Sequence, residues 1–391
     1  MAFCISTVDG THLVFSGGAR AQLVITRLII QMEIGQIQKE AENIHNEADV
    51  KTTFQTLKSC HLGEEWLTHK QRKQKSFRSI PETRIMDLSV VPVRDILIGC
   101  PDHLYVVGAA CSDGYVRFFV FNEVTKELTP LCVSMFHEHC VLKITQSFIE
   151  TEKSRGSIFL SGGTDGRIAF WDISYILLNS LPTLKVEMKN KACSDSFLCL
   201  VQNSNSASGK TSNLDTGLPL QGACNCDKIN YDSIDNDQSS SDPSSEKLTN
   251  TYSGGEKPLE PVFTIQCHQS GINAISTLSF SGGNVLIASG GDDNALILSK
   301  VLLKGDKFEL VGHCSELSAH AAQITGIKMI SKTKILTASV DQRMCLWDIL
   351  CTDLVPCQLT MVWCKFVSVP DISHMEVWED SKRFSIGITG E

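Results

Sequence analysis

The sequence lacks any run of about 18 consecutive apolar residues, which is the length that a membrane-spanning helix requires. Its first residues, MAFCISTVDGTHLVFSGG, contain no basic segment followed by an apolar one, so they do not have the pattern of a secretory signal peptide. We therefore expect a cytoplasmic or nuclear protein with no membrane partner.

The sequence also lacks an excess of positive charge, because 35 Lys and Arg stand against 44 Asp and Glu, a net charge of −9. This balance argues against a protein whose whole surface contacts nucleic acid, although a local basic stripe is compatible with it. With 42% hydrophobic residues over 391 positions, the chain can form a substantial core. Its 16 cysteines are scattered, so we expect buried reduced thiols and not a disulfide framework.

One pattern recurs along the chain: an apolar run, small residues, an aspartate, a turn or polar residue, and a second apolar run. The four copies are VGAACSDGYVRFFV (107–120), FLSGGTDGRIAFWDI (159–173), IASGGDDNALILSK (287–300) and LTASVDQRMCLWDI (336–349). SGGARAQLVI (16–25) fits the same frame, with Arg20 in place of the aspartate. Each copy indicates a β-hairpin, and apolar segments before and after it supply further strands. Four strands per repeat, and intervals of 52 and 48 residues between neighbouring aspartates, predict the blades of a β-propeller.

The sequence therefore predicts an all-β protein, a partial or irregular propeller of about five to six blades with two insertions. Residues 36–84 are rich in Glu, Gln and Lys without period-two alternation, and residues 189–257 are too polar to form a core. The expected parts are an incomplete first blade (1–35), a charged helical or irregular insertion (36–84), two blades (85–188), a disordered Ser/Asn/Asp-rich insertion (189–257), two further blades (258–368) and the start of a truncated blade (369–391).

A second set of residues recurs in register with the aspartates. A Ser or Thr lies four residues before the aspartate, a Trp can lie six residues after it, and a His lies upstream. We expect each set to form a buried hydrogen-bonded network that holds a turn against a loop. The sets are His137, Ser161, Asp165 and Trp171; His320, Thr337, Asp341 and Trp347; and His268, Ser289 and Asp293, with Ser299 in place of Trp. In the repeat of Asp113, Ala109 and Phe119 replace the Ser and the Trp, and Pro81 is the candidate for the place of the His. These sets, with WDI at 171–173 and 347–349, resemble the WD-repeat family.

Three chemical interpretations are weaker. A hydrolase triad of His, Ser and Asp would occur once, whereas these sets recur in register with a Trp. SNSASGKT (204–211) resembles a phosphate-binding loop, but it lacks the first Gly and a flanking strand and helix. His137, His139 and Cys140 lack the second pair that a zinc site requires, as do Cys224 and Cys226. We therefore expect no catalytic residue, no metal and no cofactor.

A closer resemblance rests on CHLGEEWLTHKQRKQKSFRSIPETRIMDLSVV (60–91), with GAACSDGYVRFFVF, FHEHCVLKI and HQSGINAISTL. These segments resemble the C-terminal propeller of the family of WD repeat-containing protein six, from about residue 62 to the end apart from 189–257. PETRIM makes the resemblance specific, because it lies outside the repeats. The resemblance implies a non-catalytic partner of an FtsJ-type tRNA 2′-O-ribose methyltransferase, which positions tRNA for methylation of the wobble nucleotide in the anticodon loop. S-adenosylmethionine would belong to that enzyme.

Two alternatives stay open. The family is also linked to growth control and autophagy signalling, so a general scaffold that binds signalling proteins without RNA contact is the other function. The basic run HKQRKQKSFR (69–78) is either a solvated helix face or a phosphate-contacting patch. The candidate tRNA contacts are Lys70, Arg72, Lys73, Lys75 and Arg78.

Overall fold

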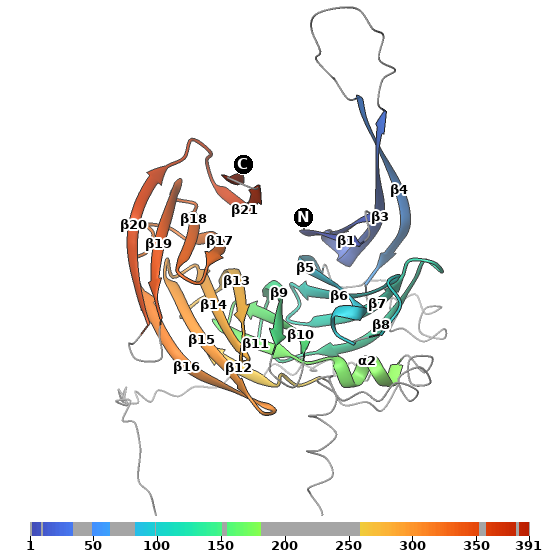
Figure 1. Ribbon diagram of the computed structural model, residues 1–391, viewed down its shortest axis with the longest axis horizontal. Coiled ribbons are helices and arrows are strands. Elements are labelled where there is room, and N and C mark those ends of the chain that lie inside the picture. The colour runs from blue at the N-terminus through green and yellow to red at the C-terminus, as the bar shows by residue number, and fades with distance from the viewer. Residues whose placement is uncertain are drawn as a thin grey trace, which may run out of the picture.

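The chain forms an open ring of β-sheets around a central axis (Figure 1). The computed structural model describes residues 2–8, 11–33, 49–62, 83–97, 99–150, 155–180, 259–351, 357–380 and 383–390. Within these ranges there are five four-stranded sheets and one two-stranded sheet, all antiparallel. The predicted all-β, propeller-like fold with five to six blades is confirmed.

The sheets are numbered 1 to 6 in chain order. Sheet 1 contains β1 (Ala2–Val8), β2 (Thr11–Gly17), β3 (Gln22–Glu33) and β4 (Asp49–His61), and sheet 2 contains β5 (Ile85–Pro92), β6 (Leu104–Cys111), β7 (Val116–Asn122) and β8 (Glu127–Ser134). Sheet 3 contains β9 (Val141–Glu150), β10 (Arg155–Gly163), β11 (Arg167–Trp171) and β12 (Phe263–Gln266). Sheet 4 contains β13 (Ile272–Phe280), β14 (Asn284–Gly291), β15 (Leu296–Lys304) and β16 (Lys307–Glu316). Sheet 5 contains β17 (Ile324–Ser331), β18 (Lys334–Ser339), β19 (Arg343–Leu350) and β20 (Gln358–Phe366), and sheet 6 contains β21 (Ile372–Asp380) and β22 (Arg383–Gly390).

The first strand of each sheet lies nearest the axis, where β1, β5, β9, β13, β17 and β21 contact one another in sequence order. Between the last inner strand, β21, and the first, β1, the rings of His374 and Phe3 lie next to each other, with 6.4 Å between their centroids. The helices among the described residues are short, namely η1 (Ala19–Ala21), η3 (Val93–Asp95) and α2 (Ser174–Ser180). None of them is long and apolar enough to cross a membrane.

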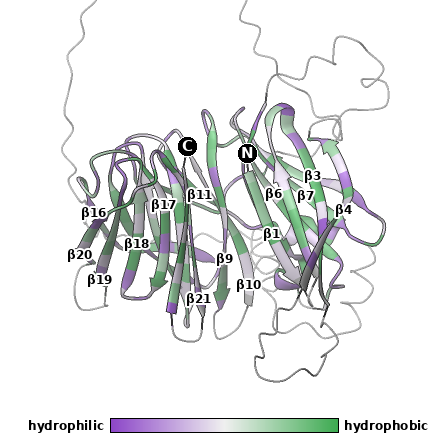
Figure 2. Ribbon diagram, turned by 90° about the horizontal axis from the view of Figure 1, so that it is seen from above, coloured by the Kyte–Doolittle hydropathy of each residue, from purple (hydrophilic) through white to green (hydrophobic). Residues whose placement is uncertain are grey.

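The hydrophobic core lies between neighbouring sheets and not inside one layer. Figure 2 shows the apolar stretches on the strands. Phe118 of sheet 2, for example, packs edge-on against Phe159 of sheet 3 at 5.2 Å between ring centroids. Both side chains are fully buried. Neighbouring sheets therefore bury their apolar residues against one another.

The structure corrects the expected boundaries in sheet 1. Strand β4 lies within the range 36–84, which was predicted to be a helical or irregular insertion, and it pairs with β3 from Gln22↔His61 to Glu33↔Asp49. Sheet 1 is thus a complete four-stranded sheet and not an incomplete blade of residues 1–35. Little in the sequence indicates this strand, because β4 lies at the outer edge, where Leu57 is the one buried apolar side chain among residues 51–61.

Sheet 3 is built from two distant segments of the chain. Strand β12 pairs with β11 through Arg167↔Gln266 and Phe170↔Phe263, although the range 189–257 separates them in sequence. Of the two blades predicted for 85–188, the first is complete within that range and the second takes its last strand from beyond it. The predicted disordered insertion itself lies outside the described residues.

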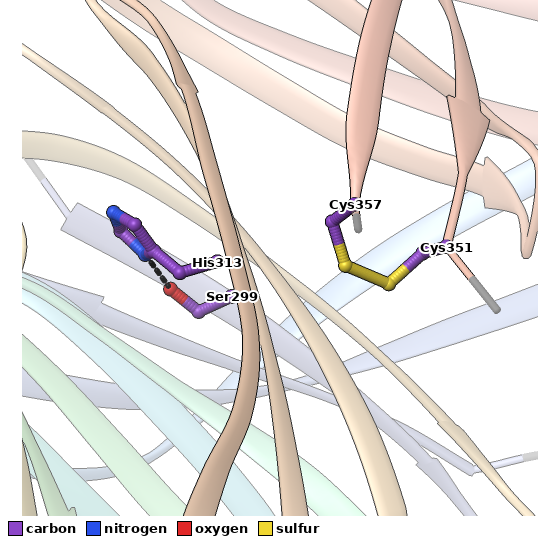
Figure 3. Close-up of a disulfide and its surroundings, with 4 residues drawn as sticks. All are labelled: Ser299, His313, Cys351 and Cys357. Atoms are coloured by element: carbon purple, nitrogen blue, oxygen red, sulfur yellow. Dashed lines mark hydrogen bonds between the residues drawn. A yellow bond between two sulfur atoms is a disulfide. The ribbon is translucent and has the colours of Figure 1, made fainter. Parts of the chain in front are cut away.

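The cysteines only partly follow the expectation of reduced thiols. Cys351 and Cys357 form a disulfide that joins the end of β19 to the segment before β20 (Figure 3). Cys111 and Cys267 are free, and burial raises their pKa values to about 11 and about 12. These two thiols therefore stay protonated at neutral pH.

Candidate functional site

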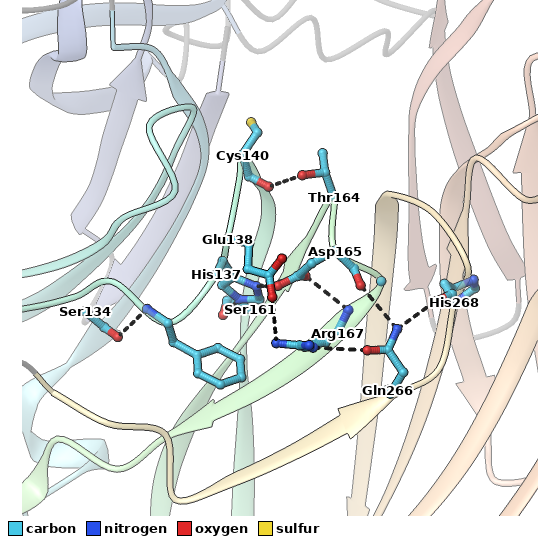
Figure 4. Close-up of polar contacts among 12 residues, drawn as sticks. Ser134, His137, Glu138, Cys140, Ser161, Thr164, Asp165, Arg167, Gln266 and His268 are labelled. Carbon is cyan, nitrogen blue, oxygen red and sulfur yellow. Dashed lines mark hydrogen bonds and ion pairs between the residues drawn. The ribbon is translucent and has the colours of Figure 1, made fainter. Parts of the chain in front are cut away.

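In sheet 3, the predicted set of four residues forms one continuous network. The Nδ1 atom of His137 lies 3.1 Å from both carboxylate oxygens of Asp165, and its Nε2 atom lies 2.8 Å from the Ser161 hydroxyl (Figure 4). The indole Nε1 of Trp171 donates to the same hydroxyl at 2.8 Å. The network thus joins the loop before β9 to the turn between β10 and β11.

The Asp165–Gly166 turn explains why these residue types occur there. The backbone N–H of Arg167 donates to the Asp165 carboxylate at 3.2 Å, which fixes the turn. Gly166 has a φ of +70°, and an added Cβ would lie 2.1 Å from the carbonyl oxygen of His268. Only glycine fits this position, because the next sheet's loop lies directly against it.

Sheet 5 contains the second complete set. The Nδ1 atom of His320 lies 3.3 and 3.2 Å from the carboxylate oxygens of Asp341, and its Nε2 atom lies 2.7 Å from the Thr337 hydroxyl. Trp347 Nε1 donates to that hydroxyl at 3.0 Å. The carboxylate also accepts the backbone N–H of Arg343 at 3.0 Å, as in sheet 3.

Sheet 4 has the same arrangement without the tryptophan. His268 lies 2.9 and 3.1 Å from the Asp293 oxygens and 2.9 Å from the Ser289 hydroxyl. Ser299 occupies the tryptophan position, and its hydroxyl lies 3.3 Å from Nδ1 of His313 on β16 (Figure 3). A Ser–His pair thus stands where the other two sheets have a Trp bonded to the Ser or Thr.

In sheet 2 the aspartate has different partners from those expected. The Thr83 hydroxyl donates to Asp113 at 3.2 Å, and the Arg117 guanidinium binds both carboxylate oxygens at 2.9 and 2.7 Å. Pro81, the sequence candidate for this place, lies outside the described residues. Sequence reasoning missed Thr83, and the only available signal was a hydroxyl residue close to the start of β5.

Burial and pairing together set the charges of these networks. Burial alone would raise the pKa values of Asp165 and Asp293, but their hydrogen bonds and charge interactions, chiefly with His137 and His268, lower both. For His320 burial dominates and lowers the pKa, although Asp341 opposes this shift. Ser161, Ser289 and Thr337 are at most 1% exposed, so no substrate can reach these hydroxyls. The arrangement can hold loops and turns together, and its hydroxyls are not placed to act as nucleophiles.

A cavity of about 430 Å³ lies at one mouth of the ring, next to the turns that carry the aspartates. Its wall is mostly neutral, and Asp371 contributes a carboxylate. The side chain of Asn273 is fixed by donation to Asp292 at 2.6 Å. Such a lining suits an uncharged polar group of a polypeptide better than a phosphate. The lining residues are Met86, Leu142, Asn273, Gln323, Thr325, Val340, Asp371, Ile372 and Ser373, of which five are the second residues of β5, β9, β13, β17 and β21.

The candidate tRNA contacts from Lys70 to Arg78 lie outside the described residues, so they stay a prediction. Within the described part of the chain, Lys143 lies close to the axis but its ammonium is 3.2 Å from the Asp87 carboxylate. That pair is locally neutral and adds no basic stripe.

Four-stranded sheets around an axis, tied by buried His, Asp and Ser or Thr, form a propeller-like fold, and their networks are similar to those of WD repeats. Residues 259–298 match the family model of the WD domain, G-beta repeat. This range begins before the outer strand of sheet 3 and ends within β15 of sheet 4. One sequence repeat thus links two sheets.

More particularly, the chain is similar to the tRNA (34-2′-O)-methyltransferase regulator WDR6 of mammals. It is 27% identical to the Mus musculus protein over 341 residues, covering 83% of this chain and 24% of the relative. The Homo sapiens protein is 27% identical over 342 residues with the same coverage, and the Rattus norvegicus protein is 26% identical over 389 residues, covering 96% and 28%. The chain thus spans about a quarter of the length of these relatives.

Among solved structures, Chaetomium thermophilum Sqt1, bound to the N-terminus of the ribosomal protein L10, superimposes with a TM-score of 0.46 at 11% identity. That superposition covers 96% of this chain and 64% of the other.

Proposed function

We propose that this chain is a non-catalytic partner of an FtsJ-type tRNA 2′-O-ribose methyltransferase and positions tRNA for methylation of the wobble nucleotide. The observation that carries the proposal is the similarity to a tRNA (34-2′-O)-methyltransferase regulator over 83% to 96% of the chain. S-adenosylmethionine would be bound by the enzyme partner. This chain would hold the tRNA in the orientation that the reaction needs and would contact its phosphates.

The physical basis of the proposal is a rigid support with a local basic stripe. Positioning two reactants lowers the barrier of a reaction without any chemistry on the support itself. The buried networks of sheets 3 to 5 supply rigidity, because each fixes a turn and a loop with three or more hydrogen bonds. The net charge of −9 disfavours tRNA over most of the surface, so the run from Lys70 to Arg78 would define where it docks.

The test is reconstitution of the methylation reaction with purified methyltransferase, tRNA and this chain. The variant Lys73→Glu/Lys75→Glu should weaken tRNA binding roughly tenfold and lower the slope of binding against salt by about two phosphate contacts. The matched control is Lys304→Glu/Lys307→Glu, which reverses two exposed charges at the turn between β15 and β16. Unchanged binding and methylation in the first variant would remove the basic run from the proposal.

A second candidate is a protein-interaction scaffold in growth or autophagy signalling without RNA contact. The acidic net charge and the mostly neutral cavity at the mouth of the ring favour it. Crosslinking the purified chain to tRNA, with and without the methyltransferase, separates the two functions. A scaffold of this kind would give no crosslink in either mixture.

A further inference from the structure

Two pairs of cysteines face each other across the last two strands of sheet 5. Cys351 and Cys357, which the disulfide joins, lie where β19 ends and just before β20 begins (Figure 3). The second pair is Cys345 on β19 and Cys364 on β20, which lie directly opposite in the strand register and are both free. Cys345 lies six residues before Cys351, a distance of about 20 Å along an extended strand. The two pairs therefore cannot exchange partners while the strands are paired.

The backbone bonds show what kind of opposed pair Cys345 and Cys364 form. The N–H of Val367 donates to the carbonyl oxygen of Gln342 at 2.8 Å, and these two residues continue the register three positions beyond the cysteines. Hydrogen-bonded and non-hydrogen-bonded pairs alternate along antiparallel strands, so the cysteines are a non-hydrogen-bonded pair. In such a pair the side chains are closest and the Cα atoms lie about 4.5 Å apart, which is within the range of about 4.4–6.8 Å that a disulfide requires.

The two thiols differ in their access to solvent. Cys345 is 1% exposed and packs in the core cluster that contains Leu298, so the pair lies on the face of sheet 5 that turns toward sheet 4. Cys364, by contrast, is the one exposed cysteine among the free cysteines of the described residues. Burial raises the pKa of the Cys345 thiol to about 12, and the adjacent Cys364 thiol adds to this shift. A reagent in solution therefore reaches Cys364 and not Cys345, which stays protonated at neutral pH.

We propose that Cys345 and Cys364 are a thiol-exchange site, which a low-molecular-weight disulfide such as glutathione disulfide converts to a second cross-strand disulfide. The Cys364 thiolate attacks one sulfur of glutathione disulfide, which forms a mixed disulfide and releases one glutathione thiolate. Cys345 then loses its proton and attacks the Cys364 sulfur, which forms the new S–S bond and expels the second glutathione thiolate. Two protein thiols are oxidised and one glutathione disulfide is reduced, and the two protons that the protein loses protonate the two glutathione thiolates.

The second disulfide would hold the end of an outer strand. Strand β20 is the edge of sheet 5, and all its side chains are exposed or half-buried, so backbone bonds provide most of its attachment. The existing disulfide lies before its first residue, whereas the new one would lie near its last. Oxidation should therefore slow hydrogen exchange of the backbone amides of residues 358–366 about tenfold. Residues 307–316 of β16, the outer strand of sheet 4, are the control and should change less than twofold.

The test treats the folded full chain with glutathione disulfide, blocks the remaining thiols with N-ethylmaleimide and analyses the fragments by mass spectrometry. Trypsin cleaves after Arg343 and Lys365, so all four cysteines lie on one peptide, residues 344–365. The number of blocked thiols in this peptide should fall from two to none, and further cleavage with chymotrypsin should show Cys345 joined to Cys364. Two blocked thiols after treatment, a lasting glutathione adduct in place of the new disulfide, or any other pairing of the four cysteines overturns the proposal.

Two variants assign the order of the steps. Cys345→Ser should stop the reaction at a glutathione adduct on Cys364, whereas Cys364→Ser should make the reaction of Cys345 at least tenfold slower, because that thiol is buried. The matched control is Cys314 on β16, which is half-buried and lies opposite Leu298, so a glutathione adduct there should persist. Equal reaction of Cys345 with and without Cys364 contradicts the proposed order, and Cys364→Ser, at an exposed position, tests this even if Cys345→Ser is unstable. This site is independent of the tRNA contact proposed above.

Discussion

Sheets 3 to 5 and sheets 1 and 2 have the same strand order but are tied to their neighbours differently. In sheets 3 to 5 a buried histidine bridges a turn aspartate and a hydroxyl. In sheet 2 the aspartate binds Thr83 and Arg117, and in sheet 1 Arg20 takes its place.

Aromatic packing joins sheets 1 and 2 instead. Phe15 lies edge-on to Phe121 with 5.9 Å between ring centroids and 6.3 Å from the ring of Tyr105. Arg27 adds an ion pair of 2.6 Å to Glu123. The comparison shows that two neighbouring sheets can pack through aromatic contacts and an ion pair where no histidine network ties the turn.

The largest difference in stability between the two groups of sheets is expected from substitution at the tryptophan position. Trp347→Ala should lower the free energy of unfolding by about 3–5 kcal/mol, because it removes a side chain that is 2% exposed and its bond to Thr337. Thr26→Ala, at the equivalent place in sheet 1, should cost less than about 1 kcal/mol. Urea unfolding of both variants measures this, and equal losses would contradict the distinction.

Removal of a histidine should have the next largest effect. His137→Ala leaves the Asp165 carboxylate, 5% exposed, without its main partner, and we expect a loss of about 2–3 kcal/mol. The comparison variant is Arg20→Ala, for which the change should stay within about 0.5 kcal/mol. A change within about 0.5 kcal/mol in both variants would mean that the polar network adds nothing at the turn.

Acid should weaken sheets 3 to 5 in two stages. The pKa of His320 is lowered in the folded state, so its contribution is present above 6.5 and is lost as pH falls below that value. The pKa values of Asp165 and Asp293 are also lowered, so their contribution is lost only as pH falls below 3.8. Melting temperatures from pH 8 to pH 3 test this. The variant His320→Gln should weaken the first stage, to which His313 and His374 also contribute because burial lowers their pKa values, and it should keep the second stage.

The smallest effect is expected in sheet 2. Thr83→Val removes one of three side-chain bonds to Asp113 and should cost about 0.5–1.5 kcal/mol, since Arg117 still binds the carboxylate. A loss as large as that of His137→Ala would show that Thr83 takes the full role of the missing histidine. Urea unfolding of the two variants side by side decides between these outcomes.

Features that recur along the sequence could be predicted from it, whereas features that occur only once could not. Asp165 and Asp341 could be paired with His137 and His320 because the same spacing recurs, and the structure places these residues in contact. Strand β4 was missed because an exposed edge strand has little alternation, and Thr83 because no repeat marks it.

The pairing of β12 with β11 has a mechanical consequence for the whole chain. Phe263 on β12 packs edge-on against Phe170 on β11, with 5.2 Å between ring centroids. A strand that follows residues 189–257 thus completes sheet 3, whose other three strands precede that range. A single proteolytic cut within 189–257 would therefore leave two pieces that stay bound to each other through the pairing of β11 with β12. Loop-closure entropy for so long a connection is only weakly dependent on its length, which makes the range between the two strands a tolerant place for added sequence.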